Sequence, residues 1–227
     1  MHRRWSLIVG IVILGLLRCL PAQAGAGPSA AAAPAAPHAP VLLVLGDSLS
    51  AGYGLDSGSG WVALLQHRLQ QKHMAWRVVN ASISGETTSG GMQRLPALLG
   101  RDHPAVVIIE LGGNDALRGL SLDATQSNLR SMVSACQYSG ARVMLIGMRM
   151  PPNYGPAYTQ RFARIFPEVA RLQHVPLVPF LLAGVVGHAD WFQSDDIHPT
   201  AQAQPVLLAN VWPVLEPLLQ QGRVRHR

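Results

Sequence analysis

Four polar segments of the chain carry the residue types that acyl transfer needs. GDSLS at residues 46–50 holds a serine, SGE at 84–86 a glycine, GGND at 112–115 an asparagine, and DDIHP at 195–199 an aspartate and a histidine. A serine hydroxyl attacks a carbonyl only when a base takes its proton, and histidine does this near neutral pH. A carboxylate orients the imidazole, and N–H donors stabilise the oxyanion. These residue types suit hydrolysis of an ester.

Each residue can be given a catalytic role. Ser48 is the expected nucleophile and His198 the expected base. Asp195 lies three residues before His198, so its carboxylate can reach the ring Nδ1. The expected oxyanion donors are the backbone N–H groups of Ser48 and Gly85 and the side-chain amide of Asn114. Because glycine has no Cβ, a substrate oxygen can approach the Gly85 N–H closely.

The same residues also have ordinary structural explanations. A serine after a strand often forms a turn, and Asn114 can hold a turn through its side chain. His198 can lie on the surface, while Asp195 or Asp196 can cap a helix. For any single residue the structural explanation is the more common one. The occurrence of all these residues in one chain, in this order, favours catalysis. Pro199 is expected to start the last helix at its first position.

Alternating apolar and amphipathic segments predict the elements that hold these residues. The strands are expected at residues 41–45, 76–80, 105–111, 142–148 and 175–178. The helices are expected at residues 61–69, 92–99, 122–136, 158–172 and 202–219. Apolar runs without polar alternation are typical of strands covered on both faces, and strand–helix alternation predicts a parallel sheet between helices. Sites in such sheets form beyond the carboxyl ends of the strands, where three of the four polar segments fall.

Length and composition indicate one folded domain. The chain has 227 residues, of which 48% are hydrophobic and 13% charged, which excludes an intrinsically disordered protein. Its net charge is +6, but six of the 18 basic residues lie in the first 24 or last five positions. The remaining 12 balance the 12 acidic residues. We therefore expect no nucleic-acid partner.

The first 24 residues have the pattern of a signal peptide. Two arginines precede an apolar stretch of 11 residues at 7–17, and AQA at 22–24 fits the cleavage pattern. This stretch is shorter than the roughly 20 residues of a membrane-spanning helix. A periplasmic or secreted location is expected. An uncleaved anchor, or a lipoprotein attached at Cys19, is the alternative.

The rest of the chain divides into three segments. Residues 25–40 are rich in Ala and Pro and predict a linker, residues 41–221 the folded domain, and residues 222–227 a basic tail. Cleavage would leave Cys136 as the only cysteine, so no intrachain disulfide is expected. Its apolar helical surroundings predict a core position.

The four segments resemble the four sequence blocks of SGNH (GDSL) hydrolases. The letters of the name correspond to Ser48, Gly85, Asn114 and His198. The stretches NASISGETTSGG, ELGGNDALRG and MRMPPNYG further resemble a bacterial periplasmic subfamily of thioesterases, lysophospholipases and arylesterases. The resemblance implies a flavodoxin-like α/β fold, a three-layer α/β/α sandwich with a five-stranded parallel sheet. It also implies a Ser–His–Asp hydrolase with no cofactor and no metal ion.

The resemblance also bears on individual residues and on the substrate. It selects Asp195 rather than Asp196 as the triad acid and gives Asp47 a structural role. The expected substrates are small-molecule acyl esters and thioesters, including lysophospholipids and acyl-CoA-type thioesters. The protein is expected to be a monomer. It is expected to contact a membrane only through a lipid substrate or through a signal peptide that is not cleaved. Substrate contacts are expected from a set of loop residues, although these side chains can equally serve only to pack the loops. The set is Leu117, Met150 and Tyr154.

Two other functions fit the same sequence less well. A carbohydrate O-deacetylase can use this fold, but the chain has only five Trp, four Tyr and four Phe with which to build a sugar platform. A catalytically silent binding protein is the second alternative. The presence of Ser48, Asp195 and His198 argues against it.

Overall fold

The computed structural model describes residues 39–221 of the chain. The predicted signal peptide at 1–24, nearly all of the linker at 25–40, and the basic tail at 222–227 lie outside the described residues. Those three predictions therefore stay predictions.

Residues 39–221 form one parallel sheet of five strands. The strands are β1 (Val41–Gly46), β2 (Arg77–Asn80), β3 (Val106–Glu110), β4 (Arg142–Ile146) and β5 (Leu177–Val178). Their order in the sheet is β2-β1-β3-β4-β5, and every pair is parallel. This is the flavodoxin-like order, in which ligands bind where β1 and β3 lead to opposite sides of the sheet. The predicted fold class is confirmed.

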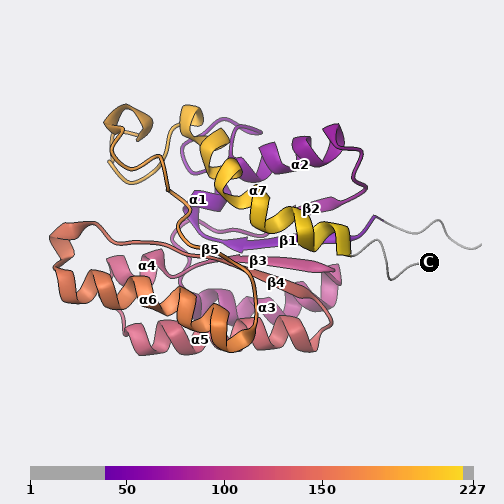
Figure 1. Ribbon diagram of the computed structural model, residues 1–227, viewed down its shortest axis with the longest axis horizontal. Helices are drawn as coiled ribbons and strands as arrows, with labels where there is room; N and C mark the ends of the chain where they lie inside the picture. Colours follow the sequence, from indigo (N-terminus) through magenta and orange to yellow (C-terminus); the bar gives the residue numbers. More distant parts are fainter. Residues whose placement is uncertain (1–38, 222–227) are drawn as a thin grey trace, which may run out of the picture. The chain divides into compact units, whose positions relative to one another are not determined.

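Helices cover both faces of this sheet (Figure 1). One face carries α2 (Trp61–Gln71) and α7 (Gln204–Gln221). The other carries α3 (Thr88–Asp102), α5 (Leu122–Tyr138) and α6 (Pro156–Gln173). Each of these five helices was predicted from apolar spacing, because each buries one stripe of side chains against the sheet.

Several shorter helices were not predicted. They are α1 (Ser48–Ala51), α4 (Gly113–Leu117) and the 3₁₀ turns η1 (Pro152–Tyr154), η2 (Ala189–Trp191) and η3 (Ala201–Ala203). Such short segments have too few residues to show a helical apolar period. Helices α1 and α4 nevertheless matter most for the site, because each begins directly after the carboxyl end of a central strand.

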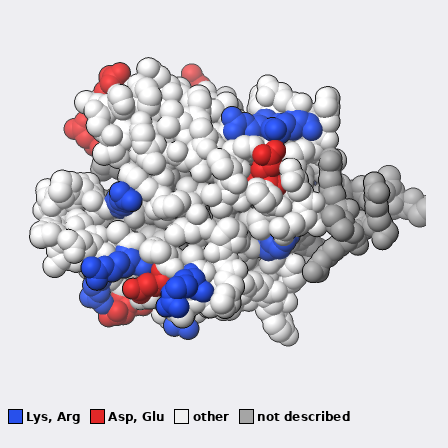
Figure 2. Space-filling model, viewed as in Figure 1, with Lys and Arg blue, Asp and Glu red and all other residues white. Residues whose placement is uncertain are grey.

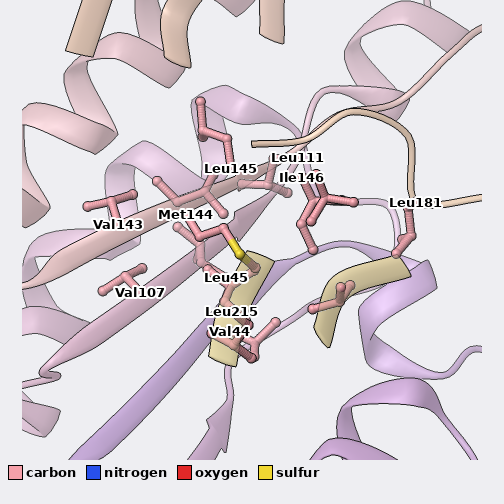
Figure 3. Close-up of a cluster of buried hydrophobic side chains, with 14 of the residues drawn as sticks. Val44, Leu45, Val107, Leu111, Val143, Met144, Leu145, Ile146, Leu181 and Leu215 are labelled. Atoms are coloured by element: carbon pink, nitrogen blue, oxygen red, sulfur yellow. The ribbon is translucent and has the colours of Figure 1, made fainter. Parts of the chain in front are cut away.

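The core is built around the central strands (Figure 3). Leu45 of β1, Val107 of β3, Met144 of β4 and Leu215 of α7 are fully buried. Leu45 lies on the face covered by α3, where its side chain is close to Gly91. Burying such a side chain contributes about 1.5–3 kcal/mol, so the core on both faces anchors the strands that carry the site. Cys136 is also fully buried, as predicted, and burial raises the pKa of its thiol to about 12.

The fifth strand is shorter than predicted. The run at 175–178 contributes only its last two residues to the sheet. The Val175 N–H instead donates to the Ala170 carbonyl at the end of α6. The first residues of the apolar run therefore close a helix rather than extend a strand.

The prediction that Pro199 starts the last helix is wrong. Pro199 forms an isolated antiparallel bridge with Phe192, and Thr200 has the extended backbone of a helix cap. The 3₁₀ turn begins only at Ala201, and α7 follows at Gln204. Because the bridge needs extended backbone, Pro199 cannot also occupy the first position of a helix.

Some of the basic and acidic side chains lie next to each other on the face drawn in Figure 2, and others stand apart. The ion pairs of the molecule include Arg161 with Asp123 at 2.6 Å and Lys72 with Glu216 at 3.2 Å. Within residues 39–221, no helix has the length and apolar character needed to cross a membrane.

Candidate active site

The nucleophile segment begins where β1 ends. The chain turns at Gly46 directly into α1, whose first residue is Ser48. The Asp47 carboxylate caps this helix by accepting from the Leu49 N–H at 3.0 Å. A Cβ at Gly46 would lie 2.7 Å from the Ser50 Cβ and 2.9 Å from Glu110 Oε2, so only glycine fits at this turn. The Ser48 N–H opens a helical turn and has no intrahelical acceptor.

Ser48, His198 and Asp195 form one hydrogen-bonded chain. His198 Nε2 lies 2.8 Å from Ser48 Oγ, and His198 Nδ1 lies 2.6 Å from Asp195 Oδ2. The second Asp195 oxygen accepts the N–H groups of Ile197 and His198, both at 3.0 Å. The contact to His198 Nδ1 comes from Asp195, whereas Asp196 supplies the left-handed backbone of the turn with φ of 57°. The carboxylate in contact with the imidazole is therefore that of Asp195.

Gln193 ties the histidine loop to the nucleophile segment. Its N–H donates to the His198 carbonyl at 2.8 Å. Its side-chain amide donates to the carbonyls of Tyr53 at 2.8 Å and of Pro199 at 3.2 Å. The Tyr53 ring also packs against the imidazole of His198, with 4.5 Å between the ring centroids. These contacts hold the imidazole over Ser48, and the sequence analysis missed both Gln193 and Tyr53 because neither is an acid–base group.

The other two expected donors follow β2 and β3. Asn114 lies on α4 and donates from Nδ2 to Asp47 Oδ2 at 3.1 Å. Gly85 has φ of 79°, a backbone conformation that favours glycine. The Arg118 guanidinium donates to the Gly85 carbonyl at 2.9 Å and lies 3.1 Å from the place a Cβ would take. The structure thus brings the Gly85 segment next to α4, at the carboxyl ends of the strands.

Hydrogen bonds set the charge of Asp195. The backbone N–H of His198, its imidazole and the N–H of Ile197 lower the pKa of Asp195 to about 2. The carboxylate is therefore ionised at neutral pH and holds a proton on His198 Nδ1. His198 Nε2 is then left as an acceptor that faces the Ser48 hydroxyl.

Two buried carboxyl groups lie below the nucleophile. Burial raises the pKa of Asp47 to about 6, against the opposing hydrogen bond from the Leu49 N–H. Burial and the charge of Asp47 raise the pKa of Glu110 well above its ordinary value. The sequence analysis included Glu110 only as part of an apolar strand. A carboxyl at the end of an otherwise apolar, buried run was the signal available, because acidic residues are almost never fully buried without a partner.

The predicted substrate-binding residues lie on segments that follow β3 and β4. Leu117 ends α4, Met150 is buried, and Tyr154 lies on η1. The Tyr154 ring stacks on Tyr158 with 6.3 Å between centroids, and the Tyr158 hydroxyl donates to the Ala116 carbonyl at 2.9 Å. The two segments are therefore linked through α6, and the binding role of the three residues stays a prediction. Among the described side chains, no group of three His, Cys, Asp or Glu is placed to hold a metal ion.

A serine, a histidine and an aspartate in hydrogen-bonded sequence are the arrangement of serine hydrolases. Here the three residues lie on a flavodoxin-like fold. Ser48 is in the sequence GDSLS and not in the G-x-S-x-G turn that carries the nucleophile of α/β-hydrolases. The sequence pattern of the GDSL-like Lipase/Acylhydrolase family matches residues 44–204. The chain belongs to this family, and the resemblance drawn from the motifs is confirmed.

The names of the relatives include esterase, thioesterase, protease and lysophospholipase. It is 55% identical to Esterase TesA of Pseudomonas aeruginosa over 181 residues, which cover 80% of this chain and 90% of the relative. It is 43% identical to Thioesterase 1/protease 1/lysophospholipase L1 of Escherichia coli, over 80% of this chain and 86% of the relative. A crystal structure of TesA superimposes with a TM-score of 0.77 at 54% identity, over 78% of this chain and 99% of that one.

Proposed function

We propose that the chain hydrolyses carboxylic esters and thioesters through an acyl-enzyme intermediate on Ser48. The observation that carries this proposal is the hydrogen-bonded chain from Ser48 Oγ through His198 to Asp195. The esterase, thioesterase and lysophospholipase names of the relatives support it.

The acylation step uses the three residues in order. As Ser48 Oγ attacks the carbonyl carbon, its proton passes to His198 Nε2. The ionised Asp195 stabilises the imidazolium through Nδ1–H. His198 then gives the proton to the departing alcohol or thiol, and the acyl group stays on Ser48. Water attacks the acyl-enzyme with the same base, which releases the acid and restores the serine.

The oxyanion would be held by three N–H donors. These are the backbone N–H groups of Ser48 and Gly85 and the side-chain amide of Asn114. The Asn114 amide carries two hydrogens, and the one not used by Asp47 is available to a substrate oxygen. Fixed donors at the developing charge are the largest single contribution to many acyl transfers.

The proposed substrates are small-molecule acyl esters and lysophospholipids. Leu117, Met150 and Tyr154 would contact the acyl chain. The signal-peptide pattern at 1–24 supports export to the periplasm or the medium, where cytosolic acyl-CoA is not the natural substrate even if it is cleaved in vitro. We further propose that residues 41–221 act as a monomeric catalytic domain behind a linker at 25–40, with a basic tail at 222–227.

The test is hydrolysis of p-nitrophenyl esters from acetyl to palmitoyl, with Ser48→Ala as the control. The expected result is a maximum between hexanoyl and dodecanoyl esters that is lost in Ser48→Ala. Activity confined to the acetyl ester would favour deacetylation, to be checked on acetylated xylan. An active, folded Ser48→Ala variant would contradict the assignment of the nucleophile.

A further inference from the structure

Tyr53 is an exposed aromatic side chain that touches the imidazole of His198. It follows α1 and is 52% exposed. Its ring centroid lies 4.5 Å from that of the imidazole, with 42° between the two planes. Contact with the imidazole therefore covers only part of the ring. Tyrosine combines a large apolar ring with a polar end and is enriched where proteins meet other molecules, so the open part of this ring is available to a substrate.

Hydrogen bonds fix the backbone of Tyr53 from both sides of the site. Its N–H donates to the Ser48 carbonyl at 3.1 Å, and its carbonyl accepts the Gln193 side-chain amide at 2.8 Å. Gln193 in turn donates its own N–H to the His198 carbonyl at 2.8 Å. Glycine follows at position 54, where a Cβ would clash with the Gln193 side chain. These bonds and the ring contact together hold the ring in one place relative to Ser48 and His198.

The proposed acylation step places the leaving group beside His198. The imidazole gives its proton to the oxygen or sulfur of the departing alcohol or thiol as the bond from that atom to the acyl carbon breaks. This atom must therefore come within hydrogen-bond distance of His198 Nε2. The rest of the alcohol or thiol lies next to the histidine, on the side of the site where Tyr53 touches it.

The two sides of the site lead into helices on opposite faces of the sheet (Figure 1). Leu117 and Tyr154, which are proposed to contact the acyl chain, lie on segments that lead into α5 and α6. Tyr53 and His198 lie on segments that lead into α2 and α7, which cover the other face. An ester bound across Ser48 with its acyl chain on the first side therefore turns its alcohol toward Tyr53 and His198.

We propose that Tyr53 forms the leaving-group subsite, where the open part of its ring packs against an aromatic alcohol such as a phenol. The inference rests on the proposed function, since it needs His198 to protonate the leaving group. Aromatic rings attract each other in offset or edge-to-face arrangements, in addition to the effect of the area that they bury. The subsite therefore favours esters of aromatic alcohols over esters of aliphatic alcohols of equal acidity.

Two hexanoate esters separate this ring contact from leaving-group chemistry. Phenyl hexanoate and hexafluoroisopropyl hexanoate have alcohols of similar acidity, but only the first alcohol is aromatic. Both esters leave the same hexanoyl group on Ser48, so the later hydrolysis of the acyl-enzyme is common to them. The ratio of their kcat/KM values therefore reports the acylation step, in which the leaving group is still present.

Substitutions of Tyr53 should change this ratio. We expect Tyr53→Leu and Tyr53→Ala to lower it about three- to tenfold, the range expected for the loss of one aromatic contact. Tyr53→Phe keeps the ring and should hold the ratio within about twofold of that of the natural protein. If Tyr53 only holds the imidazole, both esters lose rate by the same factor and the ratio stays unchanged, which would overturn the inference. Tyr138→Ala is the control, since Tyr138 is 97% exposed at the end of α5 and should leave the ratio unchanged.

Inhibition by free alcohols tests the subsite in the natural protein. Phenol should inhibit hydrolysis of hexafluoroisopropyl hexanoate competitively, and at a lower concentration than cyclohexanol, which has a similar size but no aromatic ring. Equal inhibition by the two alcohols would overturn the inference as well. Thermal unfolding shows whether each variant is folded, and if Tyr53→Leu and Tyr53→Ala are not, the inhibition experiment decides alone.

Ser48→Ala is run in parallel to distinguish the two proposals. An inactive Ser48→Ala protein, together with an unchanged ratio in the Tyr53 variants, would overturn the role of Tyr53 only. An active, folded Ser48→Ala protein would overturn the proposed function itself.

Discussion

The carboxyl groups on the two sides of Ser48 experience opposite environments. Asp195 is 37% exposed at its side chain and accepts two backbone N–H groups as well as the imidazole. Asp47 and Glu110 are buried and face each other. Hydrogen bonds lower the pKa of Asp195 to about 2, whereas burial raises that of Asp47 to about 6. The number of hydrogen-bond donors around each carboxyl group and its access to water, not the residue type, decide its charge.

This difference suits two separate tasks. The group that stabilises an imidazolium has to remain an anion throughout the reaction, and the exposed, hydrogen-bonded Asp195 does so. The groups that orient an amide need a fixed geometry more than a full charge. The buried Asp47 provides this, because its two oxygens accept the Leu49 N–H and the Asn114 amide.

The largest effect is expected from Asp195→Asn. An amide would donate to Nδ1 and favour the wrong tautomer of His198, and such a change in a serine protease triad costs about 10⁴ in kcat. The measurement is kcat on p-nitrophenyl hexanoate at neutral pH. Asp196→Asn is the matched control and should stay within about twofold of the natural protein. A loss below tenfold for Asp195→Asn would contradict the role of this carboxylate.

A smaller loss of kcat is expected from Asp47→Asn. An asparagine offers one acceptor oxygen, so either Leu49 N–H or the Asn114 amide loses its partner. We expect kcat to fall about ten- to a hundredfold, below the full cost of removing an oxyanion donor. Asp123→Asn, at an exposed ion pair on α5, is the control and should not change kcat. Equal kcat values for Asp47→Asn and Asp123→Asn would contradict the role of Asp47 in orienting the Asn114 amide.

The two carboxyl environments should also give opposite pH dependence of stability. Unfolded Asp47 loses its proton near pH 3.8, whereas folded Asp47 keeps it to about pH 6, so stability falls as the pH rises through this window by up to about 3 kcal/mol. Asp195 has the reverse sign: its stabilisation is present above pH 3.8 and is lost as the pH falls towards 2. Because Asp195 is exposed, solvent screening makes its effect small.

Urea unfolding of the natural protein and of Asp47→Asn measures this difference. The natural protein should become more stable relative to Asp47→Asn as the pH falls from 6 to 4. A constant difference between the two proteins over that range would show that Asp47 is not perturbed by burial. The same comparison with Asp195→Asn below pH 4 should show the opposite slope.

The smallest effects are expected at the proposed acyl-binding residues. Leu117→Ala and Tyr154→Ala remove apolar contacts near the site, and we expect kcat/KM for long-chain esters to fall several-fold relative to the acetyl ester, in line with about 1 kcal/mol for partly exposed contacts. Tyr138→Ala is the control, since Tyr138 is 97% exposed at the end of α5. An unchanged chain-length profile in both variants would mean that these side chains only pack the loops.

Much of the fold could be predicted because the long elements have clear periods. The apolar runs of β1, β3 and β4 and the amphipathic stripes of α5 and α6 are long enough to be recognised. The short helices α1 and α4 could not be recognised, because four or five residues are too few to show the apolar period of a helix. The start of the last helix was predicted wrongly at Pro199. A proline at the first position of a helix and a proline just before the N-cap residue cannot be told apart from the sequence.

The site was predictable to the extent that its residues have distinctive chemistry. Ser48, His198 and Asp195 are recognisable by type and spacing, and the structure places them in contact. Glu110 and Gln193 were missed, because their importance comes from neighbours that are distant in sequence. Glu110 meets Ser50 across 60 positions, and Gln193 meets Tyr53 across 140. Only the folded sheet reveals such pairs.

The central claim is that Ser48 is a nucleophile activated by His198. Labelling with a fluorophosphonate, in which the serine oxygen displaces fluoride from phosphorus, tests it directly by intact-mass and peptide mass spectrometry. The account expects one adduct, located on Ser48, with no adduct in Ser48→Ala and strongly slowed labelling in His198→Ala. Labelling of the Ser48→Ala protein at the natural rate, or an adduct on another residue of the natural protein, would contradict it.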